Sequence, residues 1–341
     1  MKSLFQLIWI PLLAGLATLL DSGCAPVHPE SKISSEYQWI KLSDTSEWSK
    51  SYNFQMLTIQ DTLWVFHHDG NWWSADGRSW TKSKLPNAIG NLAFLDYVFF
   101  QNKIFGLGHF EGNVDEHTLR PTIYFSSDRV HWDSIENTNL QKRYFYHPFV
   151  FNGKIWIIGG EQDSNIWSDI INSPDGVHWQ IMKDKLPFGP VENSQFLIFK
   201  NKIWMFNDDA WSSEDGYEWV QETKSIIPGQ KIFGYAPVVY DDLMWLIGCN
   251  RNGQFSNQVL CSEDGKNWKG QTAPWTPRGG AAASVCQNKI IMTGGKYGGT
   301  PDNPEFVYSN DVWEMAPSTL QSIPLKVDTK ADEKAKAKEK K

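Results

Sequence analysis

The chain has 341 residues, of which 41% are hydrophobic and 14% aromatic, so it is long enough to bury a substantial core. Its formal net charge of −7 and isoelectric point near 5.6 argue against a nucleic-acid partner, because such partners favour a basic face. Four cysteines are too few for a disulfide scaffold at this length, whereas 18 tryptophans point to a feature that repeats along the chain.

The N-terminus has the pattern of an export signal. Lys2 precedes an apolar run over residues 4–20, which is short for a membrane span but fits the hydrophobic region of a signal peptide. The run leads into the letters DSGC, which end at Cys24. This ending resembles the lipobox of bacterial lipoproteins, although Asp21 stands where that family usually has an aliphatic residue.

The resemblance implies that residues 1–23 are a lipoprotein signal peptide and that Cys24 becomes the lipidated N-terminus, carrying acyl chains such as palmitate. The chain would then be anchored to a membrane in the cell envelope, either facing the periplasm or exposed at the surface. Ala25 replaces the aspartate that retains some lipoproteins at the inner membrane, so the outer membrane is favoured. Residues 24–35 are predicted to be a short tether, and ordinary secretion is the alternative.

A tryptophan-anchored turn then recurs five times with the pattern Ser-x-Asp-(Gly or Arg)-x-x-Trp. Ser and Asp side chains can bond the backbone of such a turn, and glycine accepts a positive φ. Equivalent tryptophans are 40 to 52 residues apart, a period that is typical of propeller blades. The anchors of these turns are Trp80, Trp132, Trp179, Trp219 and Trp268, and we expect each ring to pack between adjacent blades.

Upstream of each turn lies an apolar run entered through a turn residue, as in NGKIWIIGG, and a sixth copy reads NKIIMTGG. This pattern predicts a hairpin that feeds a buried strand. The sixth copy has no tryptophan turn after it, but residues 37–42 around Trp39 look like an orphan strand that completes the last blade beside residues 310–315. We therefore predict an all-β fold, a six-bladed β-propeller of four-stranded blades over residues 36–317. The charged tail 318–341 is predicted to be disordered.

Two family resemblances support this fold. Residues 143–160 and 277–295 resemble kelch repeats, including the double glycines at 159–160 and 294–295. The Ser-x-Asp turns resemble the Asp-boxes of sialidase-type propellers, with Arg129 as a departure from the glycine. Both resemblances imply the propeller fold and leave the activity open, because propellers host many unrelated functions.

The repeats also predict which face of the propeller binds a ligand. The A–B and C–D turns are short and share one face, whereas the longer B–C and D–A loops share the other, where function concentrates. Each inner strand offers one equivalent position at its start: Gln55, Asp96, His147, Gln195, Ala236 and Ala282. A second ring four residues earlier holds Ser51, Leu92, Arg143, Val191, Ile232 and Arg278.

The B–C loops add further polar residues, which supply candidates for acid–base chemistry or ligand contacts. Glu161 and Tyr297 are taken as candidate ligand contacts, and the carboxylates have solvated loop positions as their alternative. The whole set is His67, His68, Asp69, His109, Glu111, Asp115, Glu116, His117, Arg120, Glu161, Asp163, Asp208, Asp209, Asn250, Arg251, Lys296 and Tyr297.

Arg143, Arg278 and Arg251 are the strongest candidates for an anionic ligand, because guanidinium groups that converge on one point suit a carboxylate. The alternative is that kelch repeats use an arginine at strand entry for packing. His147, with Asp96 and Gln195 beside it in the first ring, is a candidate ligand contact or an ordinary strand-entry histidine.

No metal or other cofactor is expected. Adjacent histidines on a strand point to opposite faces, which argues against a site at His67–His68–Asp69, and zinc-ligand spacing is absent. Cys249, Cys261 and Cys286 are predicted to be buried free thiols.

Two classes of function remain. The first is a binding or scaffold module that holds a glycan or a protein partner on the loop face. Stacking aromatics would come from Trp72, Tyr144, Tyr146, Tyr235, Trp275 and Tyr297. The second is a carbohydrate-active enzyme that resembles the sialidases or the sialic-acid epimerases. A sialidase-like site requires three loop-face arginines around one point with a carboxylate beside a tyrosine.

Overall fold

The computed structural model describes residues 37–317 except 53, 84–94, 109, 112–117, 120–121, 137–138, 141 and 163. At 110, 111, 118 and 119 it describes the backbone alone. All of these residues belong to the unit that spans residues 33–341. Several predicted features lie outside the described residues: Cys24, the tether, Leu92, His109, Asp115, Glu116, His117, Arg120, Asp163, the side chain of Glu111 and the charged tail.

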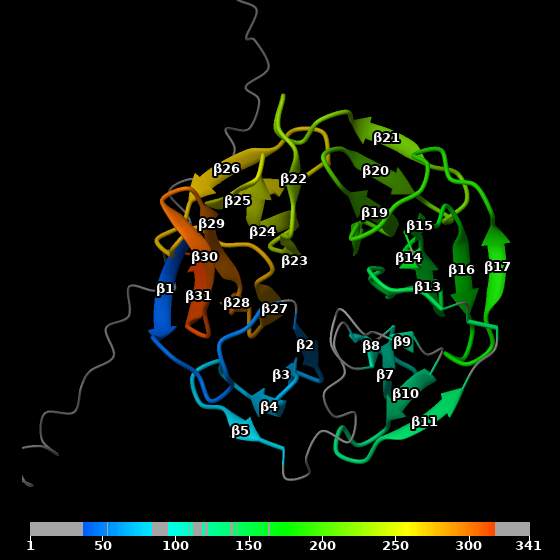
Figure 1. Cartoon of the computed structure of the whole chain (residues 1–341), viewed down its shortest axis with the longest axis horizontal. Helices are drawn as coiled ribbons and strands as arrows, with labels where there is room; N and C mark the ends of the chain where they lie inside the picture. Colours follow the sequence, from blue (N-terminus) through cyan, green and yellow to red (C-terminus); the bar gives the residue numbers. More distant parts are fainter. Residues whose placement is uncertain are drawn as a thin grey trace, which may run out of the picture. The chain divides into compact units, whose positions relative to one another are not determined.

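The described residues form six antiparallel sheets of four strands around a ring, so the predicted six-bladed β-propeller is confirmed (Figure 1). No helix in this part of the chain is long and apolar enough to cross a membrane. Blade 1 contains β2 (Gln55–Ile59), β3 (Thr62–His67), β4 (Gly70–Ser74) and β5 (Thr81–Lys82); blade 2 contains β6 (Asp96–Phe100), β7 (Lys103–Leu107), β10 (Thr122–Ser126) and β11 (Asp133–Glu136); blade 3 contains β12 (Phe149–Phe151), β13 (Lys154–Ile158), β16 (Ile170–Ser173) and β17 (Gln180–Lys183).

The remaining blades follow the same order from the inner to the outer strand. Blade 5 has an extra strand, β22 (Ile232–Phe233), which pairs with the far end of β24. Blade 4 contains β18 (Gln195–Phe199), β19 (Lys202–Phe206), β20 (Ala210–Ser213) and β21 (Val220–Thr223); blade 5 contains β23 (Ala236–Tyr240), β24 (Leu243–Arg251), β25 (Gln254–Ser262) and β26 (Lys269–Thr272); blade 6 contains β27 (Ala282–Cys286), β28 (Lys289–Thr293), β31 (Val312–Pro317) and β1 (Tyr37–Ser43).

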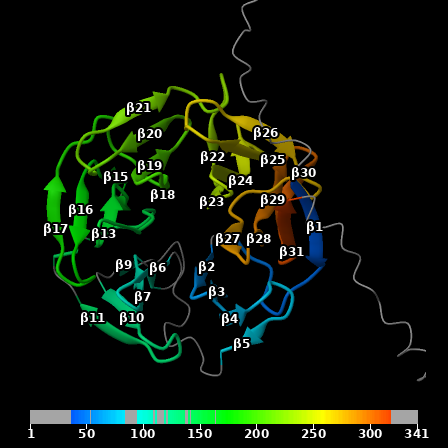
Figure 2. The same cartoon turned by 180° about the vertical axis from the view of Figure 1, so that it is seen from behind.

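The ring closes through the N-terminal strand, as the orphan Trp39 segment predicts. β1 lies antiparallel to β31, with Trp39 opposite Met315, and Figure 2 shows the two strands side by side. Beyond β1, Asn310 Nδ2 donates to the carbonyl of Trp48 at 2.7 Å. Closure of this kind removes the exposed edges that an open sheet would present.

The A–B turns are two-residue hairpins in which both central residues have positive φ, the geometry of type I′ turns that matches strand twist. This explains why turn residues precede every apolar run in the sequence. The six pairs are Gln60–Asp61, Gln101–Asn102, Asn152–Gly153, Lys200–Asn201, Asp241–Asp242 and Gln287–Asn288.

The Ser-x-Asp turns have a common hydrogen-bond pattern. In blade 5, Ser262 Oγ accepts from the N–H of Gly265 at 2.8 Å, and Asp264 Oδ1 accepts two more backbone N–H groups. The turns of blades 1 to 4 are built alike. The glycines have φ between 70° and 82°, and Arg129 takes the same conformation at 68°.

Apolar side chains fill the space between blades. Trp268 of blade 5 packs edge-on against Phe206 of blade 4, with ring centroids 5.5 Å apart, and Trp132 of blade 2 meets Phe66 of blade 1. The other four anchors meet Trp275 (Trp39), Trp48 (Trp80), Phe188 (Trp219) and the cluster around Val98 and Phe105 (Trp179). The anchors thus make the turn face part of the inter-blade core.

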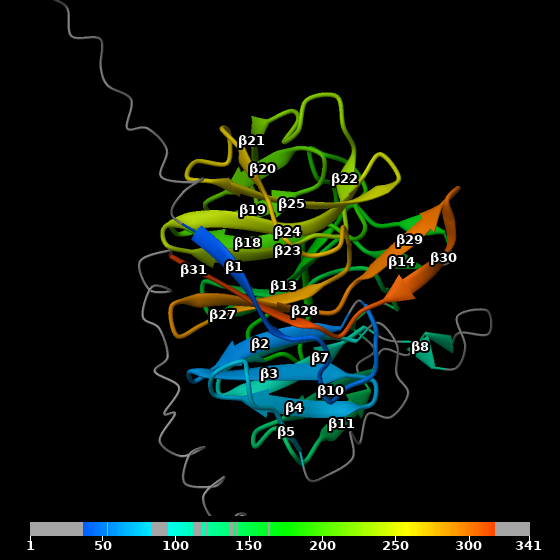
Figure 3. The same cartoon turned by 90° about the vertical axis from the view of Figure 1, so that its left-hand side faces the viewer.

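The longer connections lie on the opposite face. Figure 3 shows β8 (Phe110–Glu111), β14 (Glu161–Gln162), β22, β29 (Lys296–Thr300) and β30 (Asn303–Tyr308) on one side of the ring. β8 pairs with β9 (Thr118–Leu119) and β14 pairs with β15 (Asn165–Ile166). We call this side the loop face and the other side the turn face.

Candidate functional site

Arg143 is buried beneath the loops of blade 3, where it forms an ion pair within its own blade. Its guanidinium donates to both carboxylate oxygens of Asp169, at 2.7 and 3.0 Å, and to the carbonyl of Gly159 at 2.9 Å. The ring of Trp167 lies under the charge at 4.6 Å. Because this pairing neutralises the charge and buries it, Arg143 matches the packing role rather than that of an anion clamp.

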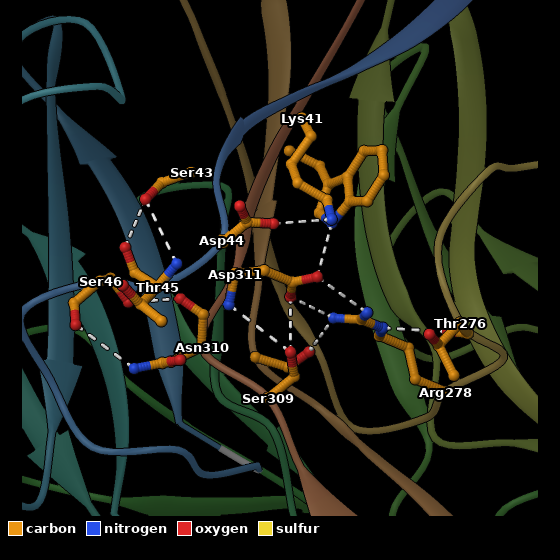
Figure 4. A network of polar contacts seen from close by, with 12 residues as sticks. Lys41, Ser43, Asp44, Thr45, Ser46, Thr276, Arg278, Ser309, Asn310 and Asp311 are labelled. Carbon is orange, nitrogen blue, oxygen red and sulfur yellow. Dashed lines mark hydrogen bonds and ion pairs between the residues drawn. The ribbon is translucent and has the colours of Figure 1, made fainter.

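Arg278 repeats this arrangement in blade 6. It pairs with both carboxylate oxygens of Asp311 and donates to the carbonyl of Thr276 at 3.1 Å (Figure 4). It also donates to the carbonyl of Gly294 at 3.0 Å. The carbonyls of Gly159 and Gly294 therefore serve equivalent arginines, which gives the two double glycines a shared structural role. The two arginines belong to blades 3 and 6, on opposite sides of the ring, and do not gather around one point.

Arg251 is half-buried at the end of β24. Its Nε donates to Gln230 Oε1 at 2.7 Å, and Nη1 donates to Gln258 Oε1. The three candidate arginines thus lie in separate environments, and the arrangement required for a sialidase-like site is absent from them. Arg120 lies outside the described residues.

The first ring of inner-strand positions does bring polar side chains together. His147 Nδ1 lies 3.0 Å from Asp96 Oδ2, and its Nε2 lies 2.8 Å from Gln195 Nε2. These three residues come from blades 2, 3 and 4 and are partly exposed. Gln55 of blade 1 extends the row, since its Oε1 accepts from the N–H of Tyr97. We call Gln55, Asp96, His147 and Gln195 the polar arc.

The proton positions in the polar arc follow from its partners. The carboxylate of Asp96 requires a proton on His147 Nδ1, so in the neutral ring Nε2 accepts from the Gln195 amide. Burial lowers the pKa of His147, but the charge of Asp96 and its hydrogen bond outweigh burial, and the pKa lies above its ordinary value. In blades 5 and 6 the same position holds Ala236 and Ala282, so the arc is confined to one side of the channel.

A carboxyl pair involves the segment that leads into the arc, since Glu192 precedes Gln195 by three residues. Glu161, on β14, accepts from Tyr144 Oη at 3.1 Å and shares a hydrogen bond with Glu192. That hydrogen bond, together with burial and the charge of Glu161, raises the pKa of Glu192 to about 7. The pair thus holds a proton near neutral pH. The sequence shows Glu161 as a loop carboxylate, but it gives no signal for Glu192.

The backbone around these groups is strained. Phe145 has φ of 56° and Asn193 has φ of 52°, a region that a bulky side chain such as phenylalanine rarely adopts. The N–H of Asn193 donates to the carbonyl of Phe145 at 2.8 Å. This bond ties the segment that leads to His147 to the segment that leads to Gln195, so strain, the carboxyl pair and the polar arc coincide in blades 3 and 4.

The aromatic side chains of the loop face differ from the prediction. Trp72, Tyr144, Tyr146, Tyr235 and Trp275 are at most 7% exposed, so the expectation that they stack on a ligand is wrong. These side chains are buried in the core, because a strand that exposes one residue at the channel buries the residues on either side of it in the sequence. Tyr297 is half-buried on β29.

The exposed aromatics of the loop face lie instead on β22, where Phe233 is 55% exposed, and on the β29–β30 hairpin of blade 6. Phe306 is 50% exposed, and Tyr308 stacks on Tyr52 with ring centroids 5.4 Å apart. Lys296 Nζ lies 4.1 Å from the centroid of Tyr52 and 4.7 Å from that of Phe306, and burial lowers its pKa. We call Tyr52, Lys296, Phe306 and Tyr308 the aromatic platform, of which only Lys296 is among the candidates named from the sequence.

The prediction that His67 and His68 face opposite ways is wrong. Their ring centroids are 4.0 Å apart, because β3 ends at His67 and His68 already belongs to the turn. Burial, followed by the charge of His68, lowers the pKa of His67 to about 4, against the opposing effect of Asp69.

The remaining predicted groups take structural roles. Cys249, Cys261 and Cys286 are buried free thiols, as expected, and burial raises the pKa of each. Asp208 Oδ1 accepts from the N–H of Ile232, and Asp209 Oδ2 accepts from Trp211 Nε1, each at 2.7 Å.

Comparison with known proteins adds support for the fold. No family model matches the sequence, and no curated protein matches it. The solved structure described as "Structure of YjhT" superposes with a TM-score of 0.64, covering 80% of this chain and 96% of that chain at 11% sequence identity. The chain is a six-bladed β-propeller. Similarity at this level of identity shows the fold alone, so function has to be argued from the loop face.

Proposed function

We propose that the chain is a binding module of the bacterial cell envelope, anchored through a lipid on Cys24, that holds a glycan at the channel mouth of its loop face. The observation that carries this proposal is the polar arc, in which Asp96, His147 and Gln195 from three consecutive blades are linked by contacts of 3.0 and 2.8 Å. Each side chain is held by its neighbour and is still partly exposed.

The chemistry of the arc suits a neutral sugar. A sugar hydroxyl both donates and accepts hydrogen bonds, and the arc offers an amide, an imidazole and a carboxylate that cover both roles. The buried arginines of blades 3 and 6 pair with their own aspartates, so the described residues provide no arginine clamp for a carboxylate ligand. The ligand class favoured is therefore a polyhydroxylated, uncharged glycan.

The aromatic platform supports the same assignment. Phe306 and Tyr308 are 50% and 36% exposed on β30, which lies on the loop face of blade 6 (Figure 3). Apolar faces of sugar rings stack on such aromatics, whereas their hydroxyls need polar partners. A glycan longer than one unit would use both features.

Screening the mature full-length chain on a glycan array, followed by calorimetry on the sugars that bind, tests the proposal. Gln195→Ala is expected to weaken binding at least tenfold, because it removes the amide at the end of the arc. Gln180→Ala, on the exposed outer strand β17, is the matched control and should bind as the parent does. An array without binding would overturn the glycan proposal and favour a protein partner.

A second candidate is an enzyme that acts on a glycan, and the carboxyl pair favours it. A carboxyl group with a pKa of about 7 can donate or accept a proton at neutral pH, as general acid–base catalysis requires. Incubation of the chain with glycosides, sialosides included, tests this candidate. Turnover that disappears in Glu192→Gln would establish it, and absence of turnover with binding retained would favour the binding module.

A further inference from the structure

The B–C turn of blade 1 gathers two imidazoles and a carboxylate. His67, the last residue of β3, pairs with Gly70, and the intervening residues His68 and Asp69 form the turn. One ligand atom from each of His67, His68 and Asp69 lies within 4.8 Å of the others. The closest pair is His68 Nε2 and Asp69 Oδ1, at 2.8 Å.

The orientation of His67 is fixed by its surroundings. Its side chain is fully buried, with the ring 5.0 Å from that of Phe54 and 6.1 Å from that of Trp72. Nδ1 accepts the backbone N–H of Asp69 at 3.1 Å, so this nitrogen has no proton and its lone pair is directed at the turn. Asp69 Oδ1 lies 3.4 Å from it, so two acceptor atoms face each other.

We propose that a divalent transition-metal ion of the zinc class binds between His67, His68 and Asp69. Imidazole nitrogens and a carboxylate oxygen at about 2.0–2.2 Å are ordinary zinc ligands, and three protein ligands leave a position for water. A cation bound here would take the His67 lone pair in place of the N–H of Asp69 and would also attract the carboxylate, so the contact between two acceptors would be replaced by two metal–ligand contacts. His68 is 53% exposed, so its side chain is free to make the small movement that closer ligation requires.

The site would also strengthen ring closure. Asp69 Oδ2 accepts the N–H of Ser49 at 2.7 Å, and Ser49 belongs to the connection from β1 to β2 that closes the propeller. An ion bound to Asp69 would hold this connection against blade 1. This inference is independent of the glycan proposal, since it involves neither the polar arc nor the aromatic platform.

Titration of the untagged, metal-free mature chain with Zn²⁺ in a calorimeter, with thermal unfolding measured in parallel, tests the proposal. One ion per chain and a rise of a few degrees in Tm at saturating zinc are expected, because a ligand that binds only the folded state stabilises it. His68→Ala and Asp69→Asn should each weaken binding at least tenfold. Both residues are near the surface, so the variants should remain folded, which circular dichroism checks.

His178→Ala is the matched control. His178 Nδ1 lies 2.6 Å from Asp175 Oδ2, so this turn has an imidazole and a carboxylate but no second histidine. The control variant should bind zinc as the parent does. Absence of binding at 1 mM zinc, or unchanged binding in His68→Ala, would overturn the proposal.

Discussion

On the turn face, five Ser-x-Asp turns repeat one set of hydrogen bonds, whereas the B–C connections of the loop face differ from blade to blade. On the turn face, the Ser and Asp oxygens accept hydrogen bonds from backbone N–H groups, and the tryptophans pack between blades. The loop face leaves the polar arc, the carboxyl pair and the aromatic platform partly exposed. Repeated motifs in this chain therefore build the rigid part of the fold, and a recognition site is expected among residues that do not recur.

One carboxyl group on each face has a pKa shifted in the opposite direction to the other. The backbone N–H of Ser79 is the main reason that the pKa of Asp76 on the turn face is lowered. On the loop face, the hydrogen bond with Glu161 is the main reason that the pKa of Glu192 is raised to about 7. Folding therefore favours the charged form of Asp76 and the protonated form of Glu192.

The largest effect is expected for a loop-face residue that is structural despite its position. Arg278→Met leaves Asp311 buried without its guanidinium, which should lower the free energy of unfolding by about 3–5 kcal/mol. Arg251→Met, which loses only hydrogen bonds to two half-buried glutamines, should cost about 1–2 kcal/mol. Urea unfolding measures both, and equal costs would contradict the assignment of Arg278 as a buried structural ion pair.

The next largest loss of stability is expected for a substitution on the turn face. A Cβ at Gly265 would lie 1.9 Å from the ring of Trp204 in the preceding blade, with φ of +70°. Gly265→Ala should therefore lower the free energy of unfolding by about 3 kcal/mol, from overpacking and left-handed strain together. Gly253 has a φ of +85°, and a Cβ added there would have nothing within 4 Å. Gly253→Ala should therefore lower the free energy of unfolding by about 1 kcal/mol, from backbone strain alone. If the two variants unfold alike, the turns do not hold the blades together as described.

A smaller effect follows from the raised pKa of Glu192. A carboxyl group whose pKa is higher in the folded state stabilises the fold fully below pH 4.5, and this contribution is lost as the pH rises through about 7. Glu192→Gln should remove that loss. The free energy of unfolding of the variant should therefore be about 1 kcal/mol higher than that of the parent at pH 8, a figure reduced for solvent screening of this partly exposed group. Unfolding curves at pH 4, 6 and 8 measure it, and an unchanged pH profile in the variant would contradict the shared proton.

The smallest expected effect on stability has the opposite dependence on pH. The lowered pKa of Asp76 contributes stability above its unfolded pKa near 3.8, and this is lost as the pH falls through the folded value. Asp76→Asn should lower the free energy of unfolding by about 0.5 kcal/mol at pH 7, because the group is exposed, and by less as the pH falls below 3.8. Acid unfolding of the parent and the variant measures this, and a difference that is the same at every pH would show that the charge is not responsible.

The sequence predicts most of the fold because its repeats encode local geometry. The turn residues before each apolar run become type I′ turns, and the Trp39 segment pairs with β31 as its pattern indicates. Counting from the turns also places Asp96, His147 and Gln195 at one level of the channel, since equivalent positions in a repeat share a height. Their direct contacts then follow from the order of blades 2, 3 and 4.

Other parts of the site depend on contacts that leave no local pattern. Glu192 meets Glu161 only because the D–A loop before blade 4 folds over the B–C hairpin of blade 3. Trp72 and Tyr235 resemble exposed aromatics in the sequence, yet inter-blade packing buries them. His67 and His68 converge because the strand ends one residue earlier than alternation assumes.

Glycan binding by a matched pair of histidine variants tests the central claim most directly. His147 and His178 each pair with an aspartate, the first in the polar arc and the second on the turn face. We predict that His147→Ala weakens binding of the glycan identified on the array at least tenfold, whereas His178→Ala binds it as the parent does. Equal binding by the two variants, or a loss confined to His178→Ala, would contradict the assignment of recognition to the loop face.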